Sequence, residues 1–235
     1  MGLVDVKGLQ KTSLVDYPPY IASTVFVGRC NFRCPFCHNP DLVLDYEVMS
    51  DISEEELFAH LVSRKGIVDG VCVTGGEPTL YKGLPLFIKR VRDLGFLVKL
   101  DTNGSNPEML KFLVDQRLVN YVAMDVKAPK DKYVVAAGLS VDLEKVNESV
   151  EFLKEGKVNY EFRTTFVPCL IGKEDVIKIG LWLEGADKFF IQQFVSSARL
   201  LSKDFENKKP FSLKELEEFR ELLSSYIKKV EIRGV

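Results

Sequence analysis

The chain has 235 residues, a formal net charge of −2 at pH 7 and a hydrophobic fraction of 46%. These values are ordinary for a globular protein, and the length fits one sizeable domain. Acidic and basic residues are interspersed, which excludes the basic surface typical of nucleic-acid-binding proteins. No apolar run approaches the roughly 18 residues of a membrane helix, so we expect neither a nucleic-acid nor a membrane partner.

Short β-rich runs alternate with amphipathic helical segments along the chain. In chain order, strands are predicted at residues 23–28, 70–74, 96–101, 119–126, 160–167 and 188–194. Helices are predicted at residues 53–63, 84–94, from 107 onward, 143–154, 173–184 and from 212 onward. Ser53 with Glu56, and Ser212 with Glu215, have the spacing of capping boxes. The final run, KKVEIR, predicts a short terminal strand.

This order predicts an α/β fold with a mostly parallel sheet and helices outside it. A complete eight-fold barrel needs about 250 residues, so we expect a partial (β/α)6 TIM-like barrel. The prediction is a single domain over 1–235, with a lead-in at 1–22, a β/α core at 23–194, and a connector and helix at 195–235.

Only five cysteines occur, and three of them lie within eight positions. An odd, clustered set argues against a disulfide framework. The N-terminus lacks a basic head followed by an apolar run, so we expect no signal peptide and a cytoplasmic protein.

Polar residues follow successive predicted strands, where β/α proteins carry their chemistry. These residues are Cys30, Cys34 and Cys37; Gly75, Gly76 and Glu77; Asp101 and Asn103; Asp125 and Lys127; and Gln192 and Gln193. Each group has a structural explanation, such as a tight turn or a surface ion pair. Their coincidence at five strand ends instead favours one shared cavity.

Four kinds of site compete for the three cysteines. A zinc ion needs four ligands, and His38 would have to be the fourth. A c-type haem would use Cys34-x-x-Cys37-His38, and a thioredoxin-like pair would use two cysteines, but both leave Cys30 without a role. The fourth kind is an iron–sulfur cluster with three thiolate ligands and one open iron.

The spacing Cys30-x3-Cys34-x2-Cys37, with Phe36 before the last cysteine, resembles the signature of the radical S-adenosylmethionine (radical SAM) enzymes. The resemblance implies a [4Fe-4S] cluster whose open iron binds S-adenosylmethionine. Reductive cleavage then yields methionine and a 5′-deoxyadenosyl radical. The resemblance also implies that Gly75, Gly76 and Glu77 contact the methionine amino group. It further implies that the backbone of Phe36 and His38 contacts the adenine.

Residues 37–39, 101–104 and 125–127 resemble the glycyl-radical-enzyme activases, such as pyruvate formate-lyase activating enzyme. This resemblance implies that Lys127 reaches the S-adenosylmethionine carboxylate and that Arg163 lies near the cofactor. The wider set of expected cofactor-binding residues also contains Asp101, Asn103, Asp125 and Gln193. By the same resemblance, Asp101, Thr102 and the Ala123 carbonyl form a monovalent-cation site.

Residues 8–18, 37–40 and 190–194 resemble the anaerobic ribonucleoside-triphosphate reductase activating proteins. The implied activity is hydrogen abstraction from a glycine Cα of that partner, with an electron donor such as flavodoxin or ferredoxin. The alternatives are a radical enzyme acting on a small molecule, as in carboxy-deazaguanine synthesis, and a non-catalytic iron–sulfur electron carrier. Cys72 is expected to be an ordinary buried thiol, and Cys169 is assigned no role.

Overall fold

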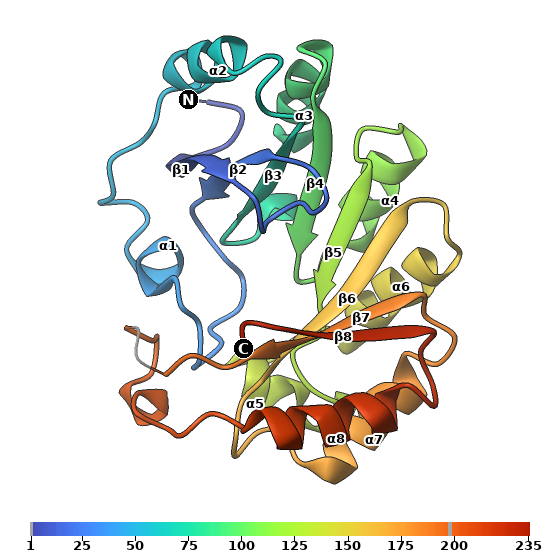
Figure 1. Ribbon diagram of the computed structural model, residues 1–235. Helices are drawn as coiled ribbons and strands as arrows, with labels where there is room; N and C mark the ends of the chain where they lie inside the picture. The colour runs from blue at the N-terminus through green and yellow to red at the C-terminus, as the bar shows by residue number, and fades with distance from the viewer. Residues whose placement is uncertain (1, 197–198) are drawn as a thin grey trace.

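One curved sheet of eight strands organises the part of the chain that the computed structural model describes, residues 2–196 and 199–235 (Figure 1). Strands that follow one another in sequence are neighbours in the sheet, and all pairs are parallel except the antiparallel pair β1 and β2. The strands are β1 (Val6–Ser13), β2 (Ala22–Val27), β3 (Gly70–Gly75), β4 (Leu97–Thr102), β5 (Tyr121–Asp125), β6 (Asn159–Phe166), β7 (Lys188–Gln193) and β8 (Lys229–Arg233).

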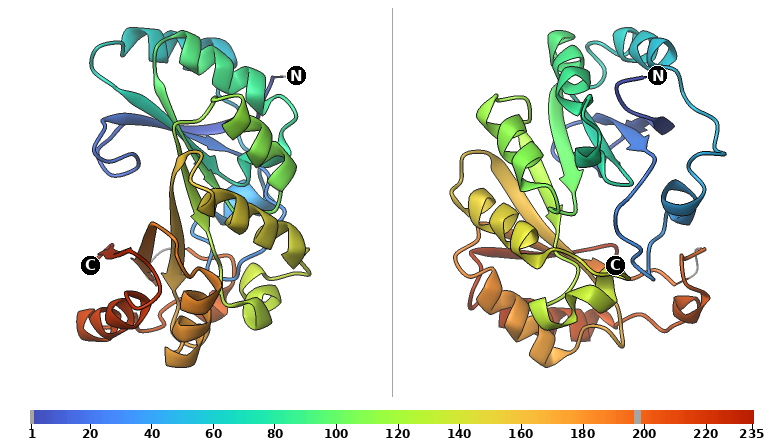
Figure 2. Two further views of the ribbon diagram at one scale, coloured as in Figure 1. Left: turned by 90° about the vertical axis from the view of Figure 1, so that its right-hand side faces the viewer. Right: turned by 180° about the vertical axis from the view of Figure 1, so that it is seen from behind.

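Helices connect the parallel strands and cover the outer face of the sheet (Figure 1). A side view shows the green and yellow helices together on one side of the strands (Figure 2, left). The α-helices are α1 (Pro40–Leu44), α2 (Glu54–Ser63), α3 (Leu84–Asp93), α4 (Pro107–Asp115), α5 (Tyr133–Ala137), α6 (Leu143–Lys154), α7 (Lys173–Trp182) and α8 (Leu213–Leu223). Short 3-10 helices span Pro78–Leu80, Lys130–Lys132 and Lys203–Phe205.

The partial barrel predicted from the sequence is confirmed. The six predicted strands correspond to β2 through β7, and the last five residues of KKVEIR form β8. Strands β1 and β8 are the two edges of the sheet, so the barrel stays open on one side.

One strand and two α-helices of the described residues were not predicted, and neither were the short 3-10 helices. Strand β1 lies in the expected lead-in, where its half-buried and exposed residues show no alternation of apolar and polar side chains. Helices α1 and α5 have only five residues each, too few for a 3.6-residue periodicity to be recognised.

The predicted helix starts are largely confirmed. Ser212 and Glu215 form a reciprocal capping box at the start of α8. At α2, the Ser53 hydroxyl accepts the Glu56 N–H at 3.1 Å, and that single contact supplies one of the donors that a helix start leaves unpaired. Asn106 caps α4 through the N–H of Met109.

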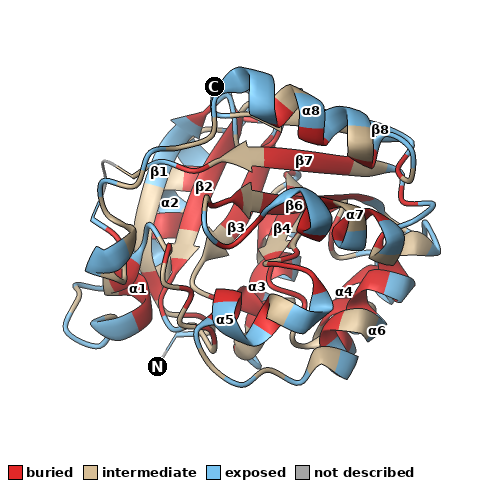
Figure 3. Ribbon diagram, turned by 90° about the horizontal axis from the view of Figure 1, so that it is seen from below, coloured by how far each residue is buried: buried red, intermediate tan, exposed pale blue. Residues whose placement is uncertain are grey.

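Buried residues concentrate in the central strands and on the helix faces that meet them (Figure 3). Strands β3 to β5 contribute Val73, Leu100 and Val122, which are fully buried. Such β-branched and aliphatic runs are typical of parallel strands that are covered on both faces. No helix in the described residues is long and apolar enough to span a membrane.

Strand register sets which inward-facing side chains become neighbours. Asp101 on β4 is opposite Ala123 on β5, which is opposite Glu161 on β6. One step further along, Asp125 is opposite Arg163. Because side chains in register lie on the same face of a sheet, the barrel interior receives a closely spaced set of charged groups.

Candidate active site at the carboxyl ends of the strands

The three clustered cysteines lie on the loop that follows β2, and all three line one cavity of about 330 Å³. Cys34 is buried, whereas Cys30 and Cys37 are half-buried. The loop curls around Arg33, whose guanidinium donates to the carbonyls of Cys30 at 2.7 Å and Phe32 at 2.8 Å. The Arg33 N–H also donates to the Ala137 carbonyl at the end of α5, at 2.8 Å, so the short helix anchors the loop.

The surroundings of the sulfur atoms fit thiolate ligands. The N–H of Phe32 faces Cys30 Sγ at 3.3 Å, and the N–H of Asn39 faces Cys37 Sγ at 3.4 Å. Backbone donors of this kind are among the groups that tune iron–sulfur clusters. Burial raises the pKa of Cys30 to about 12 and that of Cys34 to about 11. These thiols are therefore neutral until iron displaces their protons.

Within residues 2–196 and 199–235, no three His, Cys, Asp or Glu side chains are arranged to hold a single metal ion. The Nε2 atom of His38 contacts the Val195 carbonyl at 2.9 Å, so this nitrogen is engaged by the backbone rather than by a thiol-bound metal. The side chain of Phe36 is buried. Both residues line the cavity, and their predicted contact with adenine stays a prediction.

Gly75 and Gly76 run directly against the backbone that leads into the cysteine loop. Gly75 has a φ of +112°, and a Cβ there would lie 2.5 Å from the Val27 carbonyl oxygen. A Cβ on Gly76 would lie 2.1 Å from the Arg29 carbonyl oxygen. The two glycines are therefore required by the packing of one strand end on the next, which is a different reason from the cofactor contact predicted for them.

Glu77 is buried, and its carboxylate is bonded within the protein. Oε1 accepts the N–H and hydroxyl of Thr79 at 3.1 and 2.6 Å and the hydroxyl of Thr102 at 2.8 Å. Oε2 accepts the Asn103 N–H at 2.7 Å. Burial raises the pKa of this carboxyl, and the four donors act against that rise. Glu77 thus ties the β3 loop to the end of β4, and a contact with a ligand ammonium stays a prediction.

An unbroken chain of opposite charges crosses the barrel interior. Lys99 Nζ lies 2.5 Å from Asp101 Oδ1, and Asp101 Oδ2 lies 3.0 Å from Arg163 Nη1. Arg163 Nε lies 2.8 Å from Asp125 Oδ1, and Asp125 Oδ2 lies 3.1 Å from Lys127 Nζ. The ion pair between Asp125 and Lys127 thus exists, but inside the cavity rather than on the surface. Asp125 holds Lys127 in place and keeps its pKa above the ordinary value despite burial.

This network predicts a specific acid sensitivity. Burial acts to raise the pKa values of Asp101 and Asp125, but Arg163 and the neighbouring lysines outweigh burial and lower both below the ordinary 3.8. A carboxyl whose pKa is lower in the folded state stabilises the protein fully above its unfolded pKa and loses that contribution as the pH falls. We expect the urea midpoint to drop as the pH decreases from about 5 to about 3.

The matched variant is Asp125→Asn, which removes one of the two titrating groups. Its urea midpoint is expected to be lower at neutral pH and to change less between pH 5 and pH 3 than that of the wild type. Equal pH slopes for the two proteins would show that the network does not cause the acid sensitivity.

Of the remaining residues predicted at the site, some line the cavity and others do not. Asn103 lines the cavity and donates its amide to Asn31 at 2.9 Å. Of the two glutamines, Gln192 lines the cavity, whereas Gln193 donates to the Phe211 carbonyl at 2.7 Å. Successive strand residues face opposite sides, which explains why the predicted Gln193 points elsewhere. Cys72 is buried as expected, and Cys169 is exposed and outside the cavity lining.

The proposed monovalent-cation site has competing protein contacts. The Asp101 carboxylate already faces Lys99 and Arg163, and the Thr102 hydroxyl donates to Glu77. Cation binding at Asp101, Thr102 and Ala123 stays a prediction.

Sequence reasoning did not find Asp16, Arg33 or Tyr133. Asp16 lines the cavity and accepts the Thr24 hydroxyl at 2.6 Å. Tyr133 on α5 packs edge-to-face against Phe32 of the cysteine loop, and its buried hydroxyl has no hydrogen-bond partner among the described residues. Asp16 and Arg33 lie within stretches used above for the family resemblance, but no role at the site was assigned to either, and the tertiary arrangement brings all three residues to the site.

The match to a family model decides the family. Residues 24–178 match the model of the radical SAM superfamily, a range that contains the three cysteines and the interior charge network. The chain belongs to the radical SAM superfamily. It is therefore an enzyme of a family that uses a [4Fe-4S] cluster and S-adenosylmethionine, and the thiols and N–H donors of its cysteine loop fit that cluster.

Three similar proteins extend this result. A protein of Methanocaldococcus jannaschii named "putative glycyl-radical enzyme activating enzyme" is 33% identical over 98% of this chain and 96% of its own length. A 7-carboxy-7-deazaguanine synthase of Aquifex aeolicus is 27% identical over 55% of this chain and 63% of its own. A domain of pyruvate-formate lyase-activating enzyme from Bacteroides vulgatus shares the fold, with a TM-score of 0.56, 17% identity, and coverage of 70% of this chain and 99% of that domain.

Proposed function

We propose that this radical SAM enzyme activates a glycyl-radical enzyme, and that its partner is an anaerobic ribonucleotide reductase. The observation that carries the proposal is the similarity to the M. jannaschii protein, because it extends over almost the full length of both chains. The motifs at residues 8–18 and 190–194 support the narrower choice of partner through the resemblance described above.

The cofactors supply the difficult chemistry, because one-electron reduction of the bound cluster cleaves S-adenosylmethionine to methionine and a 5′-deoxyadenosyl radical. The protein residues hold the cofactors in place. Cys30, Cys34 and Cys37 would bind three irons, and the Lys127 ammonium would hold the S-adenosylmethionine carboxylate. Lys127 suits that role because Asp125 and the neighbouring Arg163 fix its position inside the cavity.

In the proposed reaction, the glycine Cα of the partner loses one hydrogen atom and keeps the unpaired electron. The hydrogen atom passes to the 5′-deoxyadenosyl group, so 5′-deoxyadenosine leaves with methionine. The electron would come from a reduced flavodoxin or ferredoxin, and we place the reaction in the cytoplasm, where cysteines remain reduced.

The proposal is tested with cluster-loaded protein, dithionite and S-adenosylmethionine, together with an anaerobic ribonucleotide reductase grown on glycine deuterated at Cα. We expect a glycyl-radical signal in the electron paramagnetic resonance spectrum and deuterium in 5′-deoxyadenosine. Formation of unlabelled 5′-deoxyadenosine without a glycyl signal would contradict this partner and favour a small-molecule substrate. Absence of 5′-deoxyadenosine would favour the electron-carrier alternative.

A further inference from the structure

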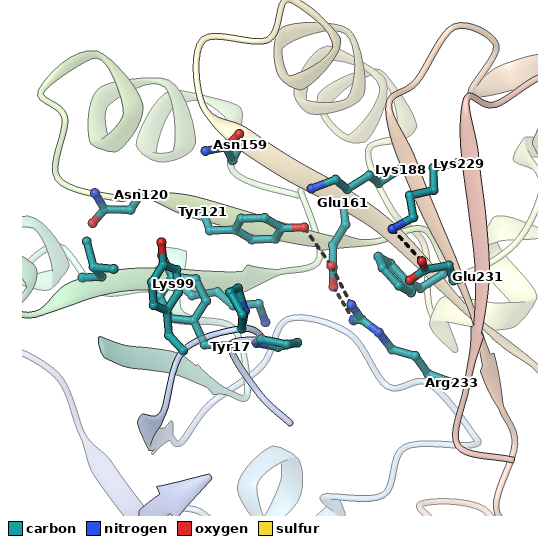
Figure 4. A pocket seen from close by; sticks show the side chains of 15 residues that line it. Tyr17, Lys99, Asn120, Tyr121, Asn159, Glu161, Lys188, Lys229, Glu231 and Arg233 are labelled. Carbon is teal, nitrogen blue, oxygen red and sulfur yellow. Dashed lines mark hydrogen bonds and ion pairs between the residues drawn. The ribbon is translucent and has the colours of Figure 1, made fainter. Parts of the chain in front are cut away.

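A second and larger cavity, of about 530 Å³, lies at the amino-terminal ends of the parallel strands (Figure 4). It is lined by the first residues of β4 to β8 and by the loop between β1 and β2. The cysteine loop follows the carboxyl end of β2, so the two cavities occupy opposite ends of the barrel. The function proposed above makes no use of this second cavity.

The interior of this end is charged where a barrel is normally apolar. Closed β/α barrels fill their interior with layers of branched aliphatic side chains. Here Lys99 and Glu161 line the cavity with only 3% and 2% of their surface exposed. Burial of charged groups is unfavourable, and an apolar replacement is often neutral or stabilising. Charged residues at such positions are therefore expected where they serve a function.

Most of these charges are balanced by protein partners. Arg233 contacts both carboxylate oxygens of Glu161, at 2.7 and 3.1 Å, and Lys229 lies 2.6 Å from Glu231. Lys99 is paired with Asp101. Figure 4 shows the first two of these pairs as dashed lines.

Lys188 is the exception. It lines the cavity and is half-buried, and no ion pair joins it to a carboxylate of the described residues within 4.0 Å. Its Nζ lies 5.5 Å from the centroid of the Tyr121 ring, toward which the side chain extends in Figure 4. The cavity therefore holds one positive charge that no neighbouring carboxylate neutralises.

We propose that this cavity binds a small organic phosphate and that Lys188 meets its phosphate group. A lysine ammonium is a common phosphate-binding group, and the volume lies in the range of sites for small organic ligands. Tyr20, which is 39% exposed, offers a ring at the edge of the cavity. Asn120 Oδ1 already accepts from Arg92 and from the Val98 N–H, so its amide N–H groups remain available to a polar ligand.

The two cavities are separate sites that share one wall. Lys99 lines the second cavity, whereas its partner Asp101 lines the first. Their 2.5 Å ion pair lies between the cavities, and the two linings share no residue. A ligand in the second cavity is therefore not expected to displace S-adenosylmethionine from the first.

The test is anaerobic isothermal titration calorimetry of the cluster-loaded protein with cytidine monophosphate, cytidine and inorganic phosphate, each with and without saturating S-adenosylmethionine. Lys188→Ala and Lys188→Gln are compared with Lys214→Ala, which removes an exposed lysine on α8. Circular dichroism establishes that each variant is folded. Cytidine monophosphate is expected to bind saturably, more tightly than phosphate or cytidine, and equally well with S-adenosylmethionine present.

Both Lys188 variants are expected to weaken this binding by about tenfold, the loss expected for a single charge-assisted contact. Lys214→Ala is expected to leave it within a factor of two. The proposal is wrong if cytidine monophosphate does not bind saturably, if S-adenosylmethionine displaces it, or if folded Lys188 variants bind it as well as the wild type. If inorganic phosphate bound as tightly as cytidine monophosphate, the claim that the cavity recognises an organic phosphate would be wrong.

Discussion

Replacement of Cys34 by alanine is expected to abolish both the visible absorbance of the reconstituted cluster and the cleavage of S-adenosylmethionine. Cys34 is the most buried of the three clustered cysteines, and its loop is held in shape by Arg33 and by the end of α5. Loss of one thiolate leaves only two protein ligands for the cluster. Changes beside a metal ligand typically reduce affinity or activity by about 10–100-fold, so removal of a ligand itself is expected to reduce cleavage by more than about 100-fold.

The matched control is Cys169→Ser, because Cys169 is exposed and does not line the cavity. This variant is expected to retain the iron content, the absorbance and the cleavage rate of the wild type. Iron and sulfide analysis, absorbance and chromatography of 5′-deoxyadenosine provide the measurements. A Cys34→Ala protein that still binds four irons and cleaves S-adenosylmethionine would show that the three cysteines do not form the ligand set.

Replacement of Glu77 by alanine is expected to be the most destabilising single change at the site. Four donors from Thr79, Thr102 and Asn103 share its carboxylate. Each buried donor left without an acceptor costs about 1–3 kcal/mol. Since water will reach some of them in the variant, we expect a loss of about 3–5 kcal/mol in the free energy of unfolding, measured by urea denaturation of the cluster-free protein.

Glu144→Ala provides the control, because Glu144 is an exposed residue in the first turn of α6. It is expected to lower the free energy of unfolding by no more than about 1 kcal/mol, the contribution of a single exposed carboxylate in a first helical turn. If Glu77→Ala were as stable as this control, then Glu77 would not tie the β3 loop to β4. Its buried carboxylate would then have to serve the ligand alone.

The sequence allowed the site to be located because parallel β/α topology places every strand's carboxyl end at the same edge. Cys34, Glu77, Asp101 and Lys127 come from four different strand ends, and all four line one cavity. The short apolar strands and the capped helices carried enough periodicity to predict this arrangement. Residues without local periodicity, such as those of β1, gave no signal from which a strand could be predicted.

The details that depend on strand register could not be predicted in the same way. Asp125 and Lys127 are two residues apart, so their proximity is local. The bridge from Asp101 through Arg163 to Asp125 instead depends on how β4, β5 and β6 align. A shift of one residue would turn these side chains to the other face, and the same ambiguity explains why Gln193 is the predicted cofactor-binding residue although Gln192 lines the cavity.

The family resemblance predicts that Gly75, Gly76 and Glu77 contact the cofactor. The structure shows in addition what these residues do for the packing of the protein itself. Gly75 and Gly76 permit close packing against the backbone before the cysteine loop, and Glu77 holds two loops together. Neither contact is visible in the sequence, because the partners lie on other strands.

The most direct test of the central claim is to incubate anaerobically reduced, cluster-loaded protein with S-adenosylmethionine and quantify the products. Three protein thiolates and an open iron predict equal amounts of 5′-deoxyadenosine and methionine, together with a change in the electron paramagnetic resonance spectrum of the reduced cluster when S-adenosylmethionine is added. A reduced four-iron cluster whose spectrum does not change, and that yields no 5′-deoxyadenosine, would contradict the account.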